Sequence, residues 1–193
     1  MSTTESTPLT RTVDGVDLPA PGTYVLDASH TDVGFSVRHL MVAKTKGRFA
    51  GVSGTVVIAD DPLASSVEVT IDAASVDSRD DKRDEHLRSA DFFDVEAHPV
   101  ITYRSTAVTP AGRGTWTVDG ELTVRGITRS VPLTVSFEGA ATSPWGTTSI
   151  GFTASAEVDR EDFGLTWNQA LETGGVLVGK QVKIDIEAEA VRQ

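Results

Sequence analysis

The chain has 193 residues, enough for one domain whose core needs no cross-link. Hydrophobic residues make up 39% and charged residues 23%, a globular balance, and a formal net charge of -11 repels phosphate backbones, which excludes nucleic acid as an expected partner. The absence of cysteine excludes disulfides, thiolate nucleophiles and cysteine zinc sites, so neither a metal nor another cofactor is expected.

The first 21 residues are rich in Ser, Thr and Pro, a composition that predicts a flexible tail, followed by one domain over residues 22–193. The opening residues have neither a basic start nor the apolar run of a secretion signal, so a cytoplasmic location is expected. No window approaches the length of a membrane-spanning apolar segment, and the acidic balance disfavours electrostatic docking on anionic lipid.

From Tyr24 onward the dominant pattern is alternation with period two, which predicts strands with one apolar face. The alternating runs, taken together with residues 24–27 and 47–59, predict eight or nine strands. Short turns such as Arg125-Gly126 predict antiparallel hairpins. The clearest alternating runs are Val33 to Val37, Val67 to Ile71, Ile101 to Tyr103, Trp116 to Val124, Val131 to Phe137, Ile150 to Val158 and Val182 to Ala188.

One helix is predicted over residues 78–88, with Ser78 as its N-cap and Asp81 at the reciprocal capping position. Because one helix cannot cover a sheet, the apolar faces must pack on each other, as two stacked sheets or as one closed sheet. Strands of about ten residues favour closure. Small residues at inward positions, such as Ala154 and Gly120, favour an all-β, antiparallel, eight-stranded barrel whose lumen holds a small apolar ligand.

Catalytic and metal motifs are weak. Ser29, His30 and Asp32 supply a hydroxyl, an imidazole and a carboxylate, but neighbours on an extended strand face opposite sides and cannot form a nucleophile relay. The four histidines lack the close spacing of zinc ligands. The glycines of residues 47–54 do not join a strand to a helix, so they predict a bend or bulge rather than a nucleotide site.

Several strings together resemble the YceI-like family over nearly the whole chain from residue 22. This resemblance implies a lipocalin-like antiparallel barrel that holds a polyisoprenoid or a similar long apolar lipid in its interior, for storage or transport and without catalysis. The strings that carry it are residues 24–40, Gly47-Arg48-Phe49 with Gly54, and residues 75–78, 83–87, 91–94, 98–106, 120–128 and 160–165.

Alternation assigns twelve side chains to the lining of this lumen. Phe92 and Phe93 are expected to close one end of the barrel, and Trp167 lies in an irregular stretch that can border the mouth. The inward direction of Phe49 depends on a bulge at Gly51 or Gly54. The twelve predicted lining residues are Phe35, Val37, Val56, Ile58, Val69, Ile71, Ile101, Tyr103, Leu122, Val135, Phe137 and Phe152.

A lipid phosphate head needs hydrogen-bond donors near the mouth. The densest basic group comprises Arg38, His39, Lys44, Lys46 and Arg48, although surface solubility explains these side chains about as well.

Two alternatives to a lipid carrier stay open. One is an enzyme with His30, His39 or Asp32 at the mouth, and the other is an interaction module whose barrel is filled by its own side chains. A homodimer is also compatible with the sequence.

Overall fold

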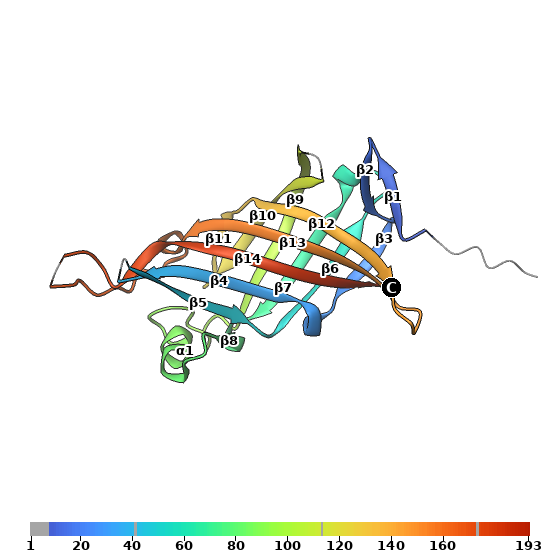
Figure 1. Ribbon diagram of the computed structural model, residues 1–193. Helices are drawn as coiled ribbons and strands as arrows, with labels where there is room; N and C mark the ends of the chain where they lie inside the picture. Colours follow the sequence, from blue (N-terminus) through green and yellow to red (C-terminus); the bar gives the residue numbers. More distant parts are fainter. Residues whose placement is uncertain (1–7, 41, 113, 173) are drawn as a thin grey trace, which may run out of the picture.

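The computed structural model describes residues 8–40, 42–112, 114–172 and 174–193, and these form a closed antiparallel β-barrel with one short α-helix (Figure 1). The wall is built from β3 (Gly22–Leu26), β4 (Asp32–His39), β5 (Ala43–Phe49), β6 (Val52–Ile58), β7 (Ser66–Asp72), β8 (Val76–Asp77), β9 (Val100–Gly112), β10 (Thr115–Val124), β11 (Ile127–Ser130), β12 (Leu133–Thr142), β13 (Thr148–Asp159) and β14 (Val178–Arg192).

Eight walls follow from this longer list because four pairs of consecutive strands each form one wall of the barrel interrupted by a corner. One of these pairs is β11 and β12, which both pair with β10 and are separated by Val131 and Pro132. β3 and β4 are separated by the 3₁₀ turn η1 (Ala28–His30), β5 and β6 by Ala50 and Gly51, and β7 and β8 by the turn η3 (Ala73–Ser75). The order around the barrel runs β13, β12, β10, β9, β7, β6, β3 and β14, and pairing of β14 with β13 closes it. The predicted eight-stranded antiparallel barrel is confirmed.

Alternation explains why the sheet closes. On β14, Val182, Ile184 and Ile186 face the interior, while the charged side chains between them face outward. Two further 3₁₀ turns, η2 (Pro62–Ala64) and η4 (Arg160–Phe163), connect strands at the two ends. At the end that carries the helix, Val76 and Phe163 are buried together with Phe92.

The helix α1 (Asp81–Arg88) begins after Asp80, whose carboxylate accepts a hydrogen bond from the Arg83 backbone N–H at 3.0 Å. The predicted Ser78 cap is therefore wrong. Ser78 is buried, and its backbone N–H donates to the Asp84 carboxylate at 2.8 Å. This serine therefore contacts a side chain of the helix but does not cap its N-terminus. The Arg88 guanidinium donates to a carbonyl of η3 at 2.8 Å and to the Val76 carbonyl at 3.0 Å, and so fixes α1 against one end of the barrel.

The predicted flexible tail differs from the structure over part of its length. β1 (Thr10–Val13) and β2 (Val16–Pro19) form a hairpin, and residues 1–7 lie outside the described part of the chain. The turn is Asp14-Gly15, with both residues at positive φ, the conformation that two-residue hairpins favour. Leu18 and Ala20 are buried against the barrel, which gives this short segment a hydrophobic surface that its average composition conceals.

Gly120 does not leave the interior empty, as the sequence suggested, because Tyr103 fills that space. A methyl group on Gly120 would lie 2.4 Å from the Tyr103 ring and hydroxyl. The Tyr103 hydroxyl donates to the carbonyls of Val118 at 2.9 Å and Val131 at 3.0 Å, and burial raises the pKa of this phenol well above its ordinary value.

We therefore expect Gly120→Ala to destabilise the fold by about 1–3 kcal/mol, because the buried Tyr103 ring must move to admit the methyl group. Urea unfolding followed by circular dichroism measures this change. Gly151→Ala is the matched control, since its new methyl group would meet no atom closer than 3.7 Å. Equal stability losses in the two variants would contradict the packing argument.

Candidate functional site

A cavity of about 480 Å³ runs inside the barrel, a volume in the range of small-molecule binding sites. Along β14, side chains from Val178 to Ala188 border it, and at the strand rise of 3.3 Å per residue this wall is roughly 30 Å long. One end lies beneath α1 and the other beneath the β1–β2 hairpin. The cavity is therefore long and narrow, and its walls are mainly aliphatic and aromatic.

The side chains that alternation placed inside all border this cavity, and their contact with a ligand stays a prediction. Phe49 also borders it, because the corner at Ala50 and Gly51 changes the phase of alternation between β5 and β6. The wall residues that the prediction left out include Trp116 and Ile184, which the same alternation would have found. The twelve predicted residues on the wall are Phe35, Val37, Val56, Ile58, Val69, Ile71, Ile101, Tyr103, Leu122, Val135, Phe137 and Phe152.

Aromatic side chains gather at the α1 end of the cavity. The His86 ring stands edge-on to Trp167, with ring centroids 4.7 Å apart, and Phe92 lies 5.4 Å from the same Trp167. Phe93 packs edge-on against Phe49 at 5.4 Å. The structure thus brings Phe92, Phe93 and Trp167 to one end of the cavity, as the sequence indicated, and adds His86 of α1, which it did not.

The predicted head-group residues divide into two sets. Arg38 and His39 border the cavity. The other three, Lys44, Lys46 and Arg48, do not border it, because they alternate along β5 with inward positions such as Thr45 and Phe49.

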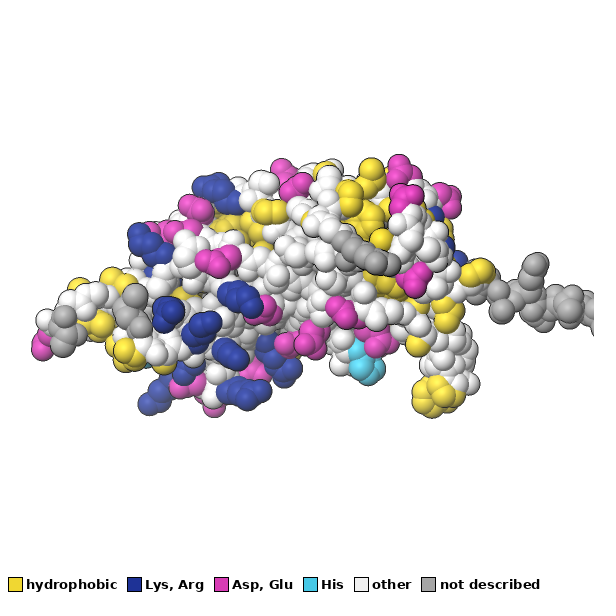
Figure 2. Space-filling model, turned by 45° about the horizontal axis from the view of Figure 1, so that its top comes forward, with side chains coloured by type: hydrophobic (Ala, Val, Ile, Leu, Met, Phe, Trp, Pro, Cys, Tyr) yellow, Lys and Arg dark blue, Asp and Glu magenta, His cyan; other side chains and the backbone are white. Residues whose placement is uncertain are grey.

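Arg48 is within 3.4 Å of Asp77 and 3.7 Å of Asp32 on the outer surface. Figure 2 shows lysine and arginine side chains gathered on the outer surface of the barrel half that carries β4, β5 and α1.

Two further arginines border the cavity near α1 and were missed, because the sequence indicates a helix but not where it docks. Arg83 projects from α1 and pairs with Asp80 at 3.2 Å. Arg160 is 5% exposed and donates to the backbone carbonyls of Gly179 at 2.8 Å and Trp167 at 3.0 Å. Burial lowers the pKa of Arg160, whose contacts hold the irregular segment between η4 and β14 in place.

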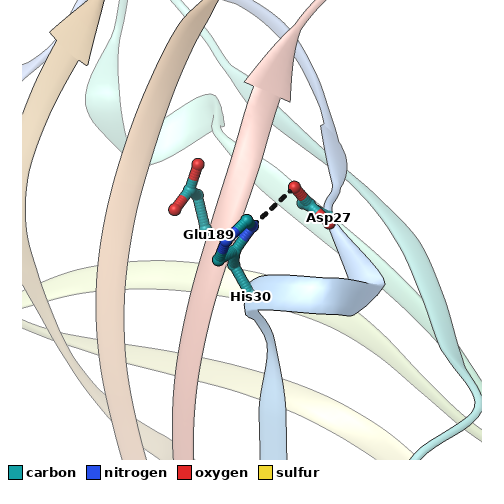
Figure 3. A group of neighbouring side chains, drawn as sticks. All are labelled: Asp27, His30 and Glu189. Carbon is teal, nitrogen blue, oxygen red and sulfur yellow. Dashed lines mark hydrogen bonds and ion pairs between the residues drawn. The ribbon is translucent and has the colours of Figure 1, made fainter. Parts of the chain in front are cut away.

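The other cluster of titratable groups is Asp27, His30 and Glu189, which lies at the η1 corner (Figure 3). Asp27 Oδ2 lies 2.9 Å from His30 Nδ1, and the other carboxylate oxygen accepts hydrogen bonds from the Ser29 backbone N–H at 2.9 Å and the Ser29 hydroxyl at 2.6 Å. Ser29 and His30 thus lie on a 3₁₀ turn rather than on the extended strand that the sequence suggested, and their carboxylate partner is Asp27 rather than Asp32.

This geometry does not form a nucleophile relay. A relay needs the hydroxyl and the carboxylate on opposite ring nitrogens of the histidine, whereas both Ser29 and Asp27 contact Nδ1 of His30. None of these side chains borders the cavity. The carboxylate of Asp27 is the N-cap of η1, so capping accounts for the cluster.

No helix in the described ranges has both the length and the hydrophobicity needed to cross a bilayer.

Residues 24–190 match the family model of the YceI-like domain. Among curated proteins, the chain is 36% identical over 171 residues to UPF0312 protein SAB2563 of Staphylococcus aureus, which covers 86% of this chain and 95% of that protein.

Solved structures share the architecture. The YCEI protein of Campylobacter jejuni is 29% identical, with a TM-score of 0.68 and coverage of 87% of this chain and 96% of that one. BcnA of Burkholderia cenocepacia has a TM-score of 0.75 at 24% identity, covering 85% of this chain and 98% of that one. A polyisoprenoid binding domain from Saccharophagus degradans has a TM-score of 0.68 at 16% identity, covering 90% and 100%. At these last two identities the likeness shows the fold alone.

The η1 cluster generates a pH prediction. Hydrogen bonds from Ser29 and His30 lower the pKa of Asp27 to about 2, and the hydrogen bond to Asp27 raises that of His30. The stabilisation from Asp27 is lost as the pH falls from about 4 through 2, and that from His30 is lost as the pH rises through its raised pKa. The pair therefore contributes most between about pH 4 and 6.5.

We expect Asp27→Asn to lower the pKa of His30, because the carboxylate that stabilises the imidazolium is removed. Titration of the His30 ring signals by nuclear magnetic resonance measures the pKa. His98 serves as the internal reference in both proteins, and an unchanged His30 titration would contradict the assigned hydrogen bond.

Proposed function

This chain belongs to the YceI-like family, and we propose that its barrel stores or transports one long apolar ligand, a polyisoprenoid or a similar lipid, without catalysing a reaction. The observation that carries the proposal is the cavity of about 480 Å³, whose mainly apolar wall extends from α1 to the N-terminal hairpin. The polyisoprenoid binding domain from Saccharophagus degradans has the same fold, which supports a ligand of this class.

Burial of hydrocarbon is sufficient to drive such binding. Each methylene group removed from water contributes up to about 0.8 kcal/mol, so a five-carbon isoprene unit contributes as much as about 4 kcal/mol before losses of motion. Three or four units are then enough for micromolar affinity, which corresponds to about 8 kcal/mol. An apolar wall discriminates weakly between similar side groups, so selectivity follows from the width and length of the cavity.

The two rival functions have less support. An interaction module with a filled barrel does not need a cavity of this size. An enzyme needs an acid, a base or a nucleophile facing its substrate. His30 and Asp32 do not border the cavity, whereas His39 and His86 do. The binding proposal accounts for the apolar wall along its full length, whereas the enzyme proposal accounts only for the histidines near one end of the cavity.

The charged groups suggest the orientation of the ligand. Arg38, His39 and Arg83 border the cavity at the α1 end, where they can donate to a phosphate or hydroxyl head. The hydrocarbon then extends along β13 and β14 toward the N-terminal hairpin. Lys44, Lys46 and Arg48 lie outside the wall and are not part of this proposed head-group site.

We expect mass spectrometry of gently extracted purified protein to detect a co-purifying apolar lipid.

We also expect Ala154→Trp to lower the affinity for a fluorescent isoprenoid alcohol by roughly tenfold or more, about 1.4 kcal/mol, because the indole occupies the middle of the cavity. Fluorescence titration measures this affinity.

The control for Ala154→Trp is Ser155→Trp, which adds the same side chain at the next position of β13, where the residue does not border the cavity. Retained binding by the control and loss by Ala154→Trp support an internal ligand. Binding that survives a Trp at Ala154, in a protein that still folds, would contradict it.

A second expectation concerns the head group. Arg83→Gln should weaken binding of an isoprenoid monophosphate severalfold while sparing the matching alcohol, because only the phosphate loses a charge-assisted hydrogen bond. Isothermal titration with both ligands measures the difference. Lys82→Gln removes the same charge from an exposed neighbour on α1 that does not border the cavity, so it should affect the two ligands equally. Equal losses for both ligands in Arg83→Gln would remove Arg83 from the head-group site.

A further inference from the structure

The β1–β2 hairpin lies outside the residues that match the family model, which begin at residue 24. It lies at the end of the barrel away from α1 (Figure 1). Leu18 and Pro19 of β2 and Arg11 of β1 border the cavity there. Leu18 is only 6% exposed, so its side chain is packed at this end rather than projecting into solvent.

Hydrogen bonds attach the hairpin and the two residues that follow it to three parts of the barrel: the connection after β6, strand β3 and strand β14. The Arg11 guanidinium donates to the carbonyls of Asp60, at 2.6 Å, and Ala59 in the connection after β6. The Tyr24 hydroxyl of β3 donates to the Ala20 carbonyl at 2.8 Å.

The Arg192 guanidinium of β14 donates to the Pro21 carbonyl at 2.9 Å. Hydrogen bonds from charged donors are stronger than those between neutral groups, so Arg11 and Arg192 fasten the segment on both sides.

The barrel residues near the hairpin are themselves buried or border the cavity. Tyr24 is fully buried with Ile150 directly below this end, and Ile58, next to the Ala59 carbonyl that accepts from Arg11, borders the cavity. The end of the barrel nearest the hairpin is therefore well packed. Its turn residues and the hydrogen-bonded Thr12 and Asp17 pair face away from the cavity, toward solvent.

We infer that the β1–β2 hairpin is the floor of the cavity and sets the greatest chain length that the barrel can bury, with Leu18 as the stop. The inference rests on the proposed function, because it specifies which apolar chains fit: linear chains that reach from the α1 end to Leu18. A longer chain must leave its last methylene groups at the α1 end in water. Those groups gain no hydrophobic stabilisation, so affinity stops rising with length.

A series of linear primary alcohols that differ by two carbons tests this floor. Affinity should rise by roughly fourfold for each added methylene until the chain reaches Leu18, and then level off. Leu18→Ala should move this break to a longer alcohol, and Leu18→Trp to a shorter one. Competition with a fluorescent fatty alcohol measures the affinities, and circular dichroism checks that each variant folds.

The matched control is Leu63→Ala, a leucine in the connection after β6 that is 51% exposed and does not border the cavity. This variant should keep the break of the wild-type protein. A break that stays at the same chain length in both Leu18 variants would overturn the inference. If Leu18→Trp does not fold, the direction of the shift in Leu18→Ala decides.

Hydrogen exchange tests the floor independently of any ligand. The Ala20 amide donates to the Leu9 carbonyl at 3.0 Å, so it should be protected in the wild-type protein and exchange roughly tenfold faster in Arg11→Met, which lacks the guanidinium contacts. An unprotected Ala20 amide in the wild type would overturn the floor. A protected hairpin on a protein that binds no alcohol of any length would instead reject the proposed function.

Discussion

Closure of the sheet sends every second side chain into one shared interior, and the rest of the structure depends on this constraint. The number of strands sets the width of a barrel, so the size of the inward side chains decides where they fill its interior. Near α1 the inward residues include the large side chains of Phe49 and Phe163. Along β13 and β14 they include Ala154 and Ala188, and the cavity follows these small side chains.

The 3₁₀ turns between the strands also explain the polar cluster at η1. Each of the turns η1, η2, η3 and η4 begins after an aspartate whose carboxylate accepts from the backbone N–H two residues later. Asp27 plays at η1 the part that Asp61 and Asp159 play at η2 and η4. The proximity of Asp27, Ser29 and His30 is therefore a consequence of turning the chain, on the outer side of the barrel and away from the cavity.

The two ends of the cavity differ in a way that suits a ligand with one polar end. At the α1 end, the polar side chains of His39 and Arg83 border the cavity, whereas at the other end Leu18 and Pro19 border it. Arg11 reaches the second end as well, but both ends of its guanidinium bond backbone carbonyls there. A head group is thus better matched to the α1 end, and the hydrocarbon to the remainder.

The sequence by itself predicted the strands of the barrel, their antiparallel arrangement and twelve of the side chains that border the cavity, because alternation is a local property that each strand carries on its own. It could not place α1, so Arg83 and His86 were missed, and it could not see that Tyr103 fills the space beside Gly120. It also described the N-terminal segment as a tail, since the surface that buries Leu18 belongs to distant strands. Only the tertiary structure decides these features, because each depends on which segments meet across the barrel, and cross-strand register and docking leave no periodic trace along the chain.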